Sequence, residues 1–210
     1  MEVSEQVKNI KRSFRLYMNG VTANSMRQKG LEYKINWGVS QSDLRRMALD
    51  CGKDKKLAYA LWKEDSIREC KLLATLIMPA EEMDNEHALE WANEIDSFEI
   101  MEFTVFNLFQ YILNADILTQ DMLKSENLIV RTGAYNLMCR IVKNNTECKS
   151  GVFNTLFIKA SSDIKRKPTN YADRQILHAL INCLDSISVS DTEYAKKSKK
   201  ILVDAGLDAF

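Results

Sequence analysis

The sequence predicts an all-α fold, a superhelical solenoid of antiparallel helix pairs in one domain spanning residues 1–210. The chain of 210 residues holds only 7 Gly and 2 Pro, which leaves little turn chemistry for a many-stranded sheet. Apolar residues recur at every third or fourth position along most of the chain, as they do in amphipathic helices. The links between the expected helices are short, which is the pattern of helix pairs that stack on one another.

Caps and turn residues set the borders of the expected helices in the first part of the chain. Asn19 and Gly20 predict a C-terminal cap for the opening helix, and Asn24 predicts the N-terminal cap of a short second helix. Ser40, with Asp43 three residues later, forms a capping box for the third. The helices expected here are residues 3–17, 25–30, 41–51, 53–63 and 66–78.

Two apolar helices are expected at the centre of the fold, at residues 96–113 and 126–142, with a shorter segment between them. Each places one charged side chain, Glu102 or Arg131, on an otherwise apolar surface. A basic loop at residues 163–169 follows them. The other helices expected in this part are residues 85–95, 152–158, 171–187 and 192–203.

Charge is distributed unevenly along the chain. Lys and Arg together number 29, as do Asp and Glu, so the net charge is zero. Between Lys71 and Lys124 there are eleven acids and no Lys or Arg, so the remainder carries a charge of +11. Basic clusters lie at residues 8–15, 45–46, 53–56, 165–167 and 196–200. Such charges either keep a protein in solution or, where they line one groove, bind the DNA backbone.

Several classes of function are excluded by motifs that the sequence lacks. It has no Gly-rich phosphate loop, no Ser-His-Asp or Cys-His signature and no CxxC pair, which argues against nucleotide hydrolysis and covalent catalysis and predicts neither a metal nor a cofactor. The five Cys, an odd number, indicate reduced core thiols of a cytoplasmic protein. The longest apolar run, residues 72–80, is too short to cross a bilayer, so no membrane partner is expected.

Four segments align weakly with one another, as the units of a helical repeat would. Setting Arg68, Glu102, Arg131 and Arg174 in register gives spacings of 34, 29 and 43 residues, which is the scale of helix-pair repeats. This register predicts that the last three of these charges occupy equivalent corners of successive repeats and form one row on one surface.

Three short segments resemble a known family. They are Gly38-Val39 followed by Asp43-Leu-Arg-Arg46, Leu61-Trp62 followed by Ile67-Arg68-Glu69, and Val130-Arg131-Thr-Gly-Ala134. Through them the chain resembles the HEAT-like-repeat DNA alkylation repair family, the helical-solenoid glycosylases that remove alkylated purines. The resemblance covers roughly residues 26–187.

The resemblance implies duplex DNA held in a basic concave groove and metal-free excision of alkylated purines. It places Glu102 at the carboxylate that stabilises the sugar cation, and Phe98 at an aromatic position where tryptophan is expected. It makes Arg131 the phosphate-binding arginine and puts His178 in the place of a second tryptophan. The resemblance, the repeat register and the basic loop together give the residues expected to bind DNA: Arg131, His178, Arg174, Lys165, Arg166 and Lys167.

Each of these residues also has a structural interpretation. Glu102 would then be a solvated charge in the acidic run that precedes it, Arg131 would pair with an acid of the preceding helix pair, and His178 would be hydrogen-bonded on a polar helix face. The alternative for the whole chain is a non-catalytic helical-repeat scaffold that binds a protein partner, favoured by the acidic centre and the replaced tryptophans. The position of the acids relative to the groove distinguishes the two.

Overall fold

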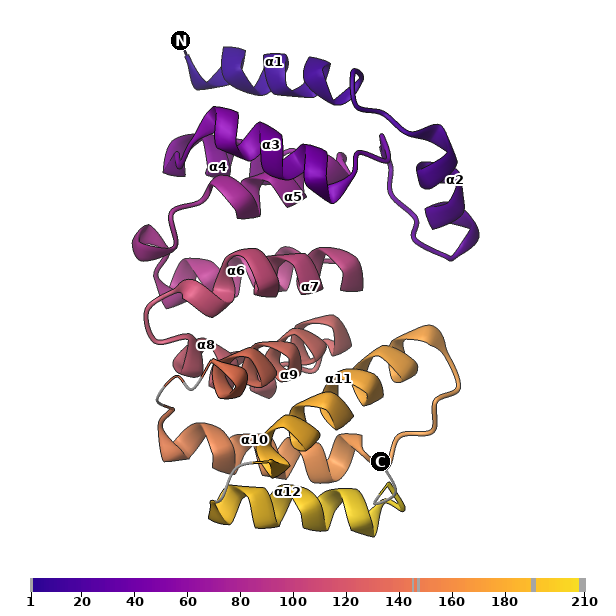
Figure 1. Cartoon of the computed structure of the whole chain (residues 1–210), viewed down its shortest axis with the longest axis vertical. Coiled ribbons are helices and arrows are strands. Elements are labelled where there is room, and N and C mark those ends of the chain that lie inside the picture. Colours follow the sequence, from indigo (N-terminus) through magenta and orange to yellow (C-terminus); the bar gives the residue numbers. More distant parts are fainter. Residues whose placement is uncertain (1, 145, 147, 190–191, 208–210) are drawn as a thin grey trace. The chain divides into compact units, whose positions relative to one another are not determined.

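The computed structural model describes residues 2–144, 146, 148–189 and 192–207, and every regular element in these ranges is helical (Figure 1). This confirms the all-α prediction. The chain divides into two compact units, Met1–Met83 and Asp84–Phe210. A helical repeat whose members touch only their neighbours divides in this way, so the single domain stays a prediction. Among the described residues, no helix combines the length and apolar character that a membrane span requires.

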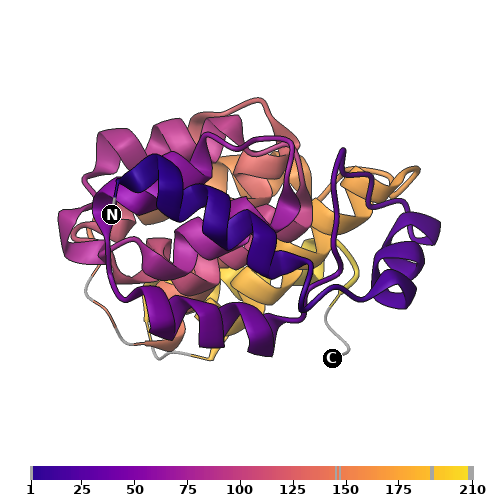
Figure 2. The ribbon, with the colours of Figure 1, turned by 90° about the horizontal axis from the view of Figure 1, so that it is seen from above.

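The first unit is built around one buried helix. α5 (Arg68–Ile77) packs against α3 (Gln41–Cys51) and α4 (Lys55–Trp62), and α1 (Val3–Phe14) packs on α4. The 3-10 turn η1 (Ala80–Glu82) follows α5. α2 (Gly20–Gln28) buries no residue, and Figure 2 shows it to the side of the other helices of this unit.

The border between α1 and α2 differs from the prediction. Asn19 begins α2 instead of ending α1, because its side-chain oxygen accepts a hydrogen bond from the backbone N–H of Thr22 at 3.0 Å. An oxygen in this position satisfies one of the free N–H groups of a helix start, and Asn24 lies inside the helix. The Ser40 cap of α3 is confirmed, since its hydroxyl accepts from the N–H of Asp43 at 3.2 Å.

The second unit has two layers of helices. One contains α7 (Phe98–Asn107), α9 (Leu128–Lys143) and α11 (Tyr171–Ser188), and the other contains α6 (Asn85–Glu94), α8 (Ala115–Lys124) and α10 (Ser150–Asp163) (Figure 1). α12 (Glu193–Asp204) packs on α10 and α11.

The expected helix over residues 96–113 is interrupted. α7 ends at Asn107 because Leu108 leaves helical geometry (φ −133°, ψ −63°), and the 3-10 turn η2 (Phe109–Tyr111) follows. Asn114, in the left-handed conformation at φ 57°, then precedes α8. The shorter segment of the prediction is therefore a complete helix of the repeat.

α9 lies at the centre of the second unit and packs against α7, α8 and α11. Gly133 allows this close packing, because a Cβ atom there would lie 2.4 Å from Sδ of Met101 and 2.8 Å from Cε of Met122. Both methionines are fully buried. α9 is therefore enclosed by neighbouring side chains on nearly every side.

Candidate nucleic-acid interface

One side of the α7, α9 and α11 layer carries the catalytic residues that the sequence predicts. Phe98, Glu102 and Phe106 follow one another at one-turn intervals on α7; the first is half-buried and the other two are exposed. On α11, Tyr171, Arg174 and His178 form an exposed stripe. We call this surface the α7–α9–α11 face; its residues are Phe98, Glu102, Phe106, Arg140, Tyr171, Arg174 and His178.

Two contacts join the three helices across this face. The rings of Phe98 and Tyr171 meet edge to face, with their centroids 5.7 Å apart. The guanidinium of Arg140 on α9 lies 4.7 Å from the ring centroid of Phe106. Glu102 is one helical turn from each of these phenylalanines, so its exposed carboxylate lies between the two contacts. The sequence alone did not point to Tyr171, although Asn170 marks the helix start immediately before it.

His178 is exposed and lies within 3.4 Å of the side-chain nitrogen of Asn182, one turn further along α11. This is the neighbour contact that the structural interpretation expects. The role of His178 in DNA binding stays a prediction.

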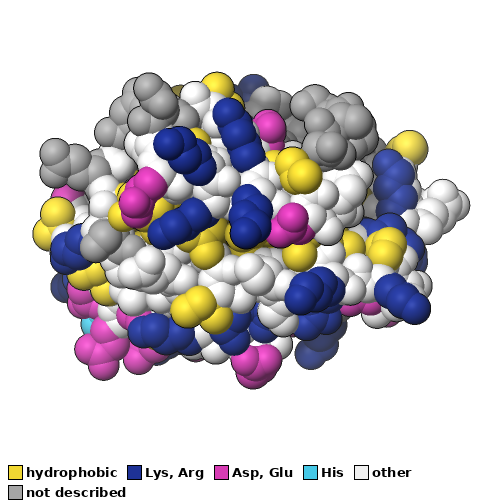
Figure 3. Space-filling model, turned by 90° about the horizontal axis from the view of Figure 1, so that it is seen from below, with side chains coloured by type: hydrophobic (Ala, Val, Ile, Leu, Met, Phe, Trp, Pro, Cys, Tyr) yellow, Lys and Arg dark blue, Asp and Glu magenta, His cyan; other side chains and the backbone are white. Residues whose placement is uncertain are grey.

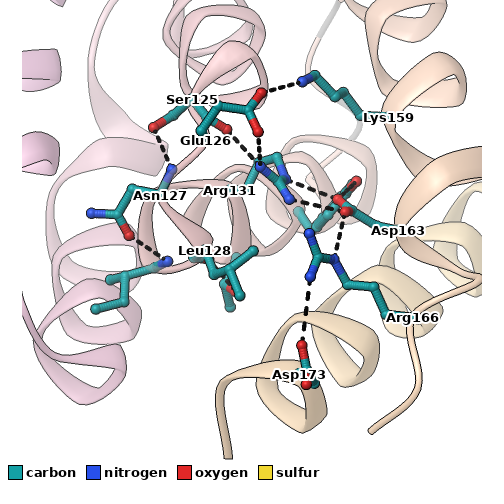
Figure 4. Close-up of polar contacts among 12 residues, drawn as sticks. Ser125, Glu126, Asn127, Leu128, Arg131, Lys159, Asp163, Arg166 and Asp173 are labelled. Carbon is teal, nitrogen blue, oxygen red and sulfur yellow. Dashed lines mark hydrogen bonds and ion pairs between the residues drawn. The ribbon is translucent and has the colours of Figure 1, made fainter. Parts of the chain in front are cut away.

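Arg131 occupies a different environment. Its side chain is 3% exposed, and its Nε and Nη2 donate to the two carboxylate oxygens of Asp163, both at 2.9 Å (Figure 4). Its Nη1 donates to the backbone oxygen of Ser125 at 2.7 Å and lies 3.7 Å from the carboxylate of Glu126. The guanidinium is thus enclosed by protein acceptors.

Asp163 accepts two further hydrogen bonds. Arg166 donates its Nε at 3.0 Å, and Tyr135 donates its hydroxyl at 2.9 Å. Burial alone would raise the pKa of Asp163, but the hydrogen bonds from Arg131, Arg166 and Tyr135 outweigh it, and the pKa is lowered. Burial, followed by the charge of Asp163, raises the pKa of Tyr135. We call these four residues, with Asp173, the Asp163 cluster.

The position of Arg131 corrects two expectations. The proposed row of surface charges is wrong, because Arg131 is buried whereas Glu102 and Arg174 are exposed. α9 is covered by helices on several sides, so equivalent sequence positions do not have equivalent exposure. The ion pair is present, but Asp163 belongs to the following helix pair instead of the preceding one. In this structure Arg131 offers no N–H group to a phosphate at the surface.

The basic loop is held in place by the Asp163 cluster. Arg166 turns inward to Asp163 and to Asp173, whose carboxylate lies 3.5 Å from its Nη1. Lys165 and Lys167, on either side of it, are exposed. Thr169 donates its hydroxyl to Asp173 at 2.9 Å and fixes the far end of the loop. The loop therefore presents two lysines to solvent from a backbone that is fixed at both ends.

Four acids of the acidic stretch are not part of the α7–α9–α11 face. Glu86, Glu90 and Glu94 are exposed one turn apart on α6, in the other layer. Asp116 is buried and accepts a hydrogen bond from the backbone N–H of Lys149. Glu102 is the exposed acid of α7.

The thiols and possible metal ligands were compared with what nucleophilic and metal sites need. The five cysteines are free, and burial raises the pKa of Cys70 to about 12 and that of Cys148 to about 11. Thiols with raised pKa values are poor nucleophiles. In the part of the chain that the structure describes, no three His, Cys, Asp or Glu side chains gather as a metal site would need.

Comparisons with known proteins agree with this architecture. Residues 10–167 match the model of a protein family described as DNA alkylation repair enzyme. No protein of curated function matches the chain at a significant level.

In three dimensions the chain is similar to a solved structure described as a new family of proteins related to the HEAT-like repeat DNA glycosylases with affinity for branched DNA structures. The two chains are 13% identical, the likeness covers 94% of this chain and 82% of that chain, and the TM-score is 0.77. At an identity this low, the likeness shows only a shared fold. That shared fold confirms the predicted solenoid of HEAT-like helix pairs.

Proposed function

Because this chain belongs to the DNA alkylation repair enzyme family, we propose that it binds duplex DNA through the basic loop and the α7–α9–α11 face. One observation carries the proposal: Arg166 is bound inward by Asp163 and Asp173, so that Lys165 and Lys167 are held outward. Cations on a fixed backbone lose little conformational freedom when they bind, and they position a duplex by its phosphates.

The charge distribution favours DNA over a basic protein partner on this face. Exposed acids gather on α6, in the other layer, while Arg140, Arg174 and the loop lysines belong to the proposed interface or its border. The similar solved structure, whose family has affinity for branched DNA, supports a nucleic-acid partner for this fold. Arg131 acts in this proposal as a positioning residue that holds Asp163, and through it the loop.

Excision of an alkylated purine is the second part of the proposal, supported by the exposure of Glu102 one turn after Phe98. In this reaction the bond between sugar and base breaks, and its electron pair leaves with the cationic base, which becomes neutral. The sugar is left as a cation that the carboxylate of Glu102 stabilises. Water then adds to the sugar and releases a proton. Phe98 and His178 would contact the nucleotide, and no metal or cofactor is needed.

DNA binding is tested by fluorescence anisotropy with a linear duplex over a range of salt concentrations. The K165Q/K167Q variant should bind more weakly, and its salt dependence should be less steep by roughly two phosphate contacts. The matched control is K29Q/K34Q, which removes two exposed lysines of the first unit. Equal affinity of the loop variant and the control would contradict the proposed interface.

Excision is tested by incubating the protein with a duplex that contains a positively charged methylated purine and measuring the free base. E102Q should release base about 100-fold more slowly than the unmodified protein, the scale of losing one electrostatic contact to a transition state. E90Q, an exposed acid of α6, should retain the rate. Tight duplex binding without base release would rule out catalysis and leave the binding proposal standing.

A further inference from the structure

The geometry points to a second DNA-binding surface on α12. We propose that the exposed lysines of this helix bind the phosphate backbone of a second duplex while the first duplex occupies the α7–α9–α11 face. The inference rests on the proposed function, because it assumes that the first duplex binds as described above. We call this surface the α12 lysine surface; its residues are Lys196, Lys197, Lys199 and Lys200.

The sequence of α12 separates an inward face from an outward one. Ala195, Ser198 and Leu202 are buried, whereas all four lysines are exposed. Figure 3, which views the molecule from below, shows Lys and Arg side chains (dark blue) gathered over the end of the second unit that carries α12. With 1.5 Å of rise per residue, the lysines span about 6 Å of helix axis, a length over which duplex DNA carries roughly three to four phosphates.

α12 is fixed firmly to the unit that carries it. Tyr194 stacks on Phe153 of α10 with ring centroids 4.0 Å apart and planes 3° from parallel. The same tyrosine ring lies 5.8 Å from the ammonium of Lys197. The lysines therefore project from an anchored helix, and phosphate binding does not require a chain segment to become ordered.

The four lysines of the surface outnumber the two acids of their own helix, Glu193 and Asp204. Among the described residues of α12, Lys197 forms an ion pair with Glu193, with its ammonium 3.6 Å from the carboxylate. Like charges at three- and four-residue spacing destabilise a helix by about 0.2–0.5 kcal/mol per pair. A polyanion would reverse this repulsion, and the backbone of DNA has the required charge density.

The α12 lysine surface does not continue the proposed interface. α10 contacts both α8 and α12, and α12 also packs on α11. In Figure 1, α12 lies below α10 at the lower end of the unit, whereas α9 lies above α10. The lysines point away from α10 and α11, whereas the α7–α9–α11 face includes α9. Two basic surfaces that face different directions fit two duplex segments better than one straight duplex.

A capture assay tests the inference. A first duplex is immobilised, the full chain is bound to it, and capture of a second, fluorescent duplex is measured. The variant K196Q/K197Q/K199Q/K200Q should bind the first duplex within about twofold of the unmodified protein but capture the second roughly tenfold less well. The corresponding four Lys→Arg substitutions keep the charge and should retain capture. Thermal unfolding checks that the variants are folded, and Gln resembles Lys in helix propensity.

The controls separate this inference from simpler explanations. Replacing Arg27, Lys29, Lys34 and Lys63 by Gln removes the same charge from exposed positions of the first unit and should leave capture intact. Equal loss of capture in this control would overturn the α12 assignment, because net charge would then explain the effect. Capture that persists in the α12 variant would overturn it as well, since another surface or a second copy of the chain would bridge the duplexes. If the unmodified protein fails to bind the first duplex, the proposed function fails together with the inference.

Discussion

At Asp163, one buried carboxylate fixes the positions of three other side chains. Arg131, Arg166 and Tyr135 all donate to it, and its side chain has little contact with water. Taking such charges out of water is costly, and they remain charged because each hydrogen-bonding position is filled by an ionic or polar partner. The same bonds hold the loop that carries Lys165 and Lys167.

Removing the charge of Asp163 should destabilise the protein strongly. D163N leaves Arg131 buried without its anion, and we expect the free energy of unfolding, measured in urea, to fall by about 3–5 kcal/mol. D121N serves as the control, because Asp121 pairs with Lys124 at the surface and its loss should cost less than about 1 kcal/mol. The double variant R131M/D163L should recover part of the stability, since apolar groups can replace a buried ion pair. A loss for D163N as small as that for D121N would contradict the role given to the Asp163 cluster.

The pKa of Asp163 predicts how this contribution changes with pH. The pKa is lowered in the folded protein, so the folded state binds this proton less readily than the unfolded state, whose aspartate pKa is about 3.9. The stabilisation is therefore complete above that pH and is lost as the pH falls through the lower folded value. We expect the stability difference between the unmodified protein and D163N to be constant near neutral pH and to shrink below about pH 4. A difference that grows on acidification would have the wrong sign for this assignment.

At the residue scale, sequence patterns located charges but not their environments. Arg131 was singled out correctly as unusual for an apolar helix, yet its partner lies 32 positions further along the chain. Spacing within one helix cannot reveal a partner at that distance. For the same reason, spacing did not indicate that Tyr135, Asp163 and Asp173 belong to one cluster with Arg131.

At the scale of elements, most helices follow from capping residues and apolar periodicity, while several borders differ from the prediction. α10, expected at residues 152–158, runs from Ser150 to Asp163, and two other borders required tertiary information. The start of α2 depends on Asn19, whose backbone N–H is bonded to the carbonyl of Trp37, far away in sequence. The break after Asn107 lies in an apolar run with no Gly or Pro. Apolar residues are buried on both sides of the break, Val105 in α7 and Phe109 in η2, so the periodicity does not mark it.

Replacing two helical glycines of the second unit by alanine should have opposite effects on stability. G133A should gain helix propensity of about 1 kcal/mol but lose about 1–3 kcal/mol by forcing Met101 and Met122 apart, giving a net loss of stability. G151A, in α10, meets only Nε2 of Gln120 at 3.7 Å and should be neutral or stabilising by up to about 1 kcal/mol. Urea unfolding of both variants measures the difference. A G133A variant as stable as G151A would mean that the methionines move aside without cost.

At the scale of the whole molecule, composition and periodicity were sufficient for the fold class, because few turn residues and short links permit little besides packed helices. The proposed interface was only partly accessible from sequence. Lys165, Lys167 and Arg174 are exposed as a DNA contact requires, whereas Arg131 and Arg166 point into the protein. Which charges reach the surface is decided by how the layers pack, and that information is distributed over many distant residues.

The separation of charge between layers leads to a prediction for DNA affinity. Glu86, Glu90 and Glu94 lie on α6, in the layer opposite the proposed interface, so the triple Gln variant should change duplex affinity by less than about threefold at physiological salt, where charges are screened beyond about 8 Å. Glu102 lies on the α7–α9–α11 face, and E102Q should bind undamaged duplex more tightly, because a carboxylate beside phosphates weakens binding. Both are measured by anisotropy at several salt concentrations. A larger gain in affinity for the α6 variant than for E102Q would place the duplex along α6 and would refute the proposed interface.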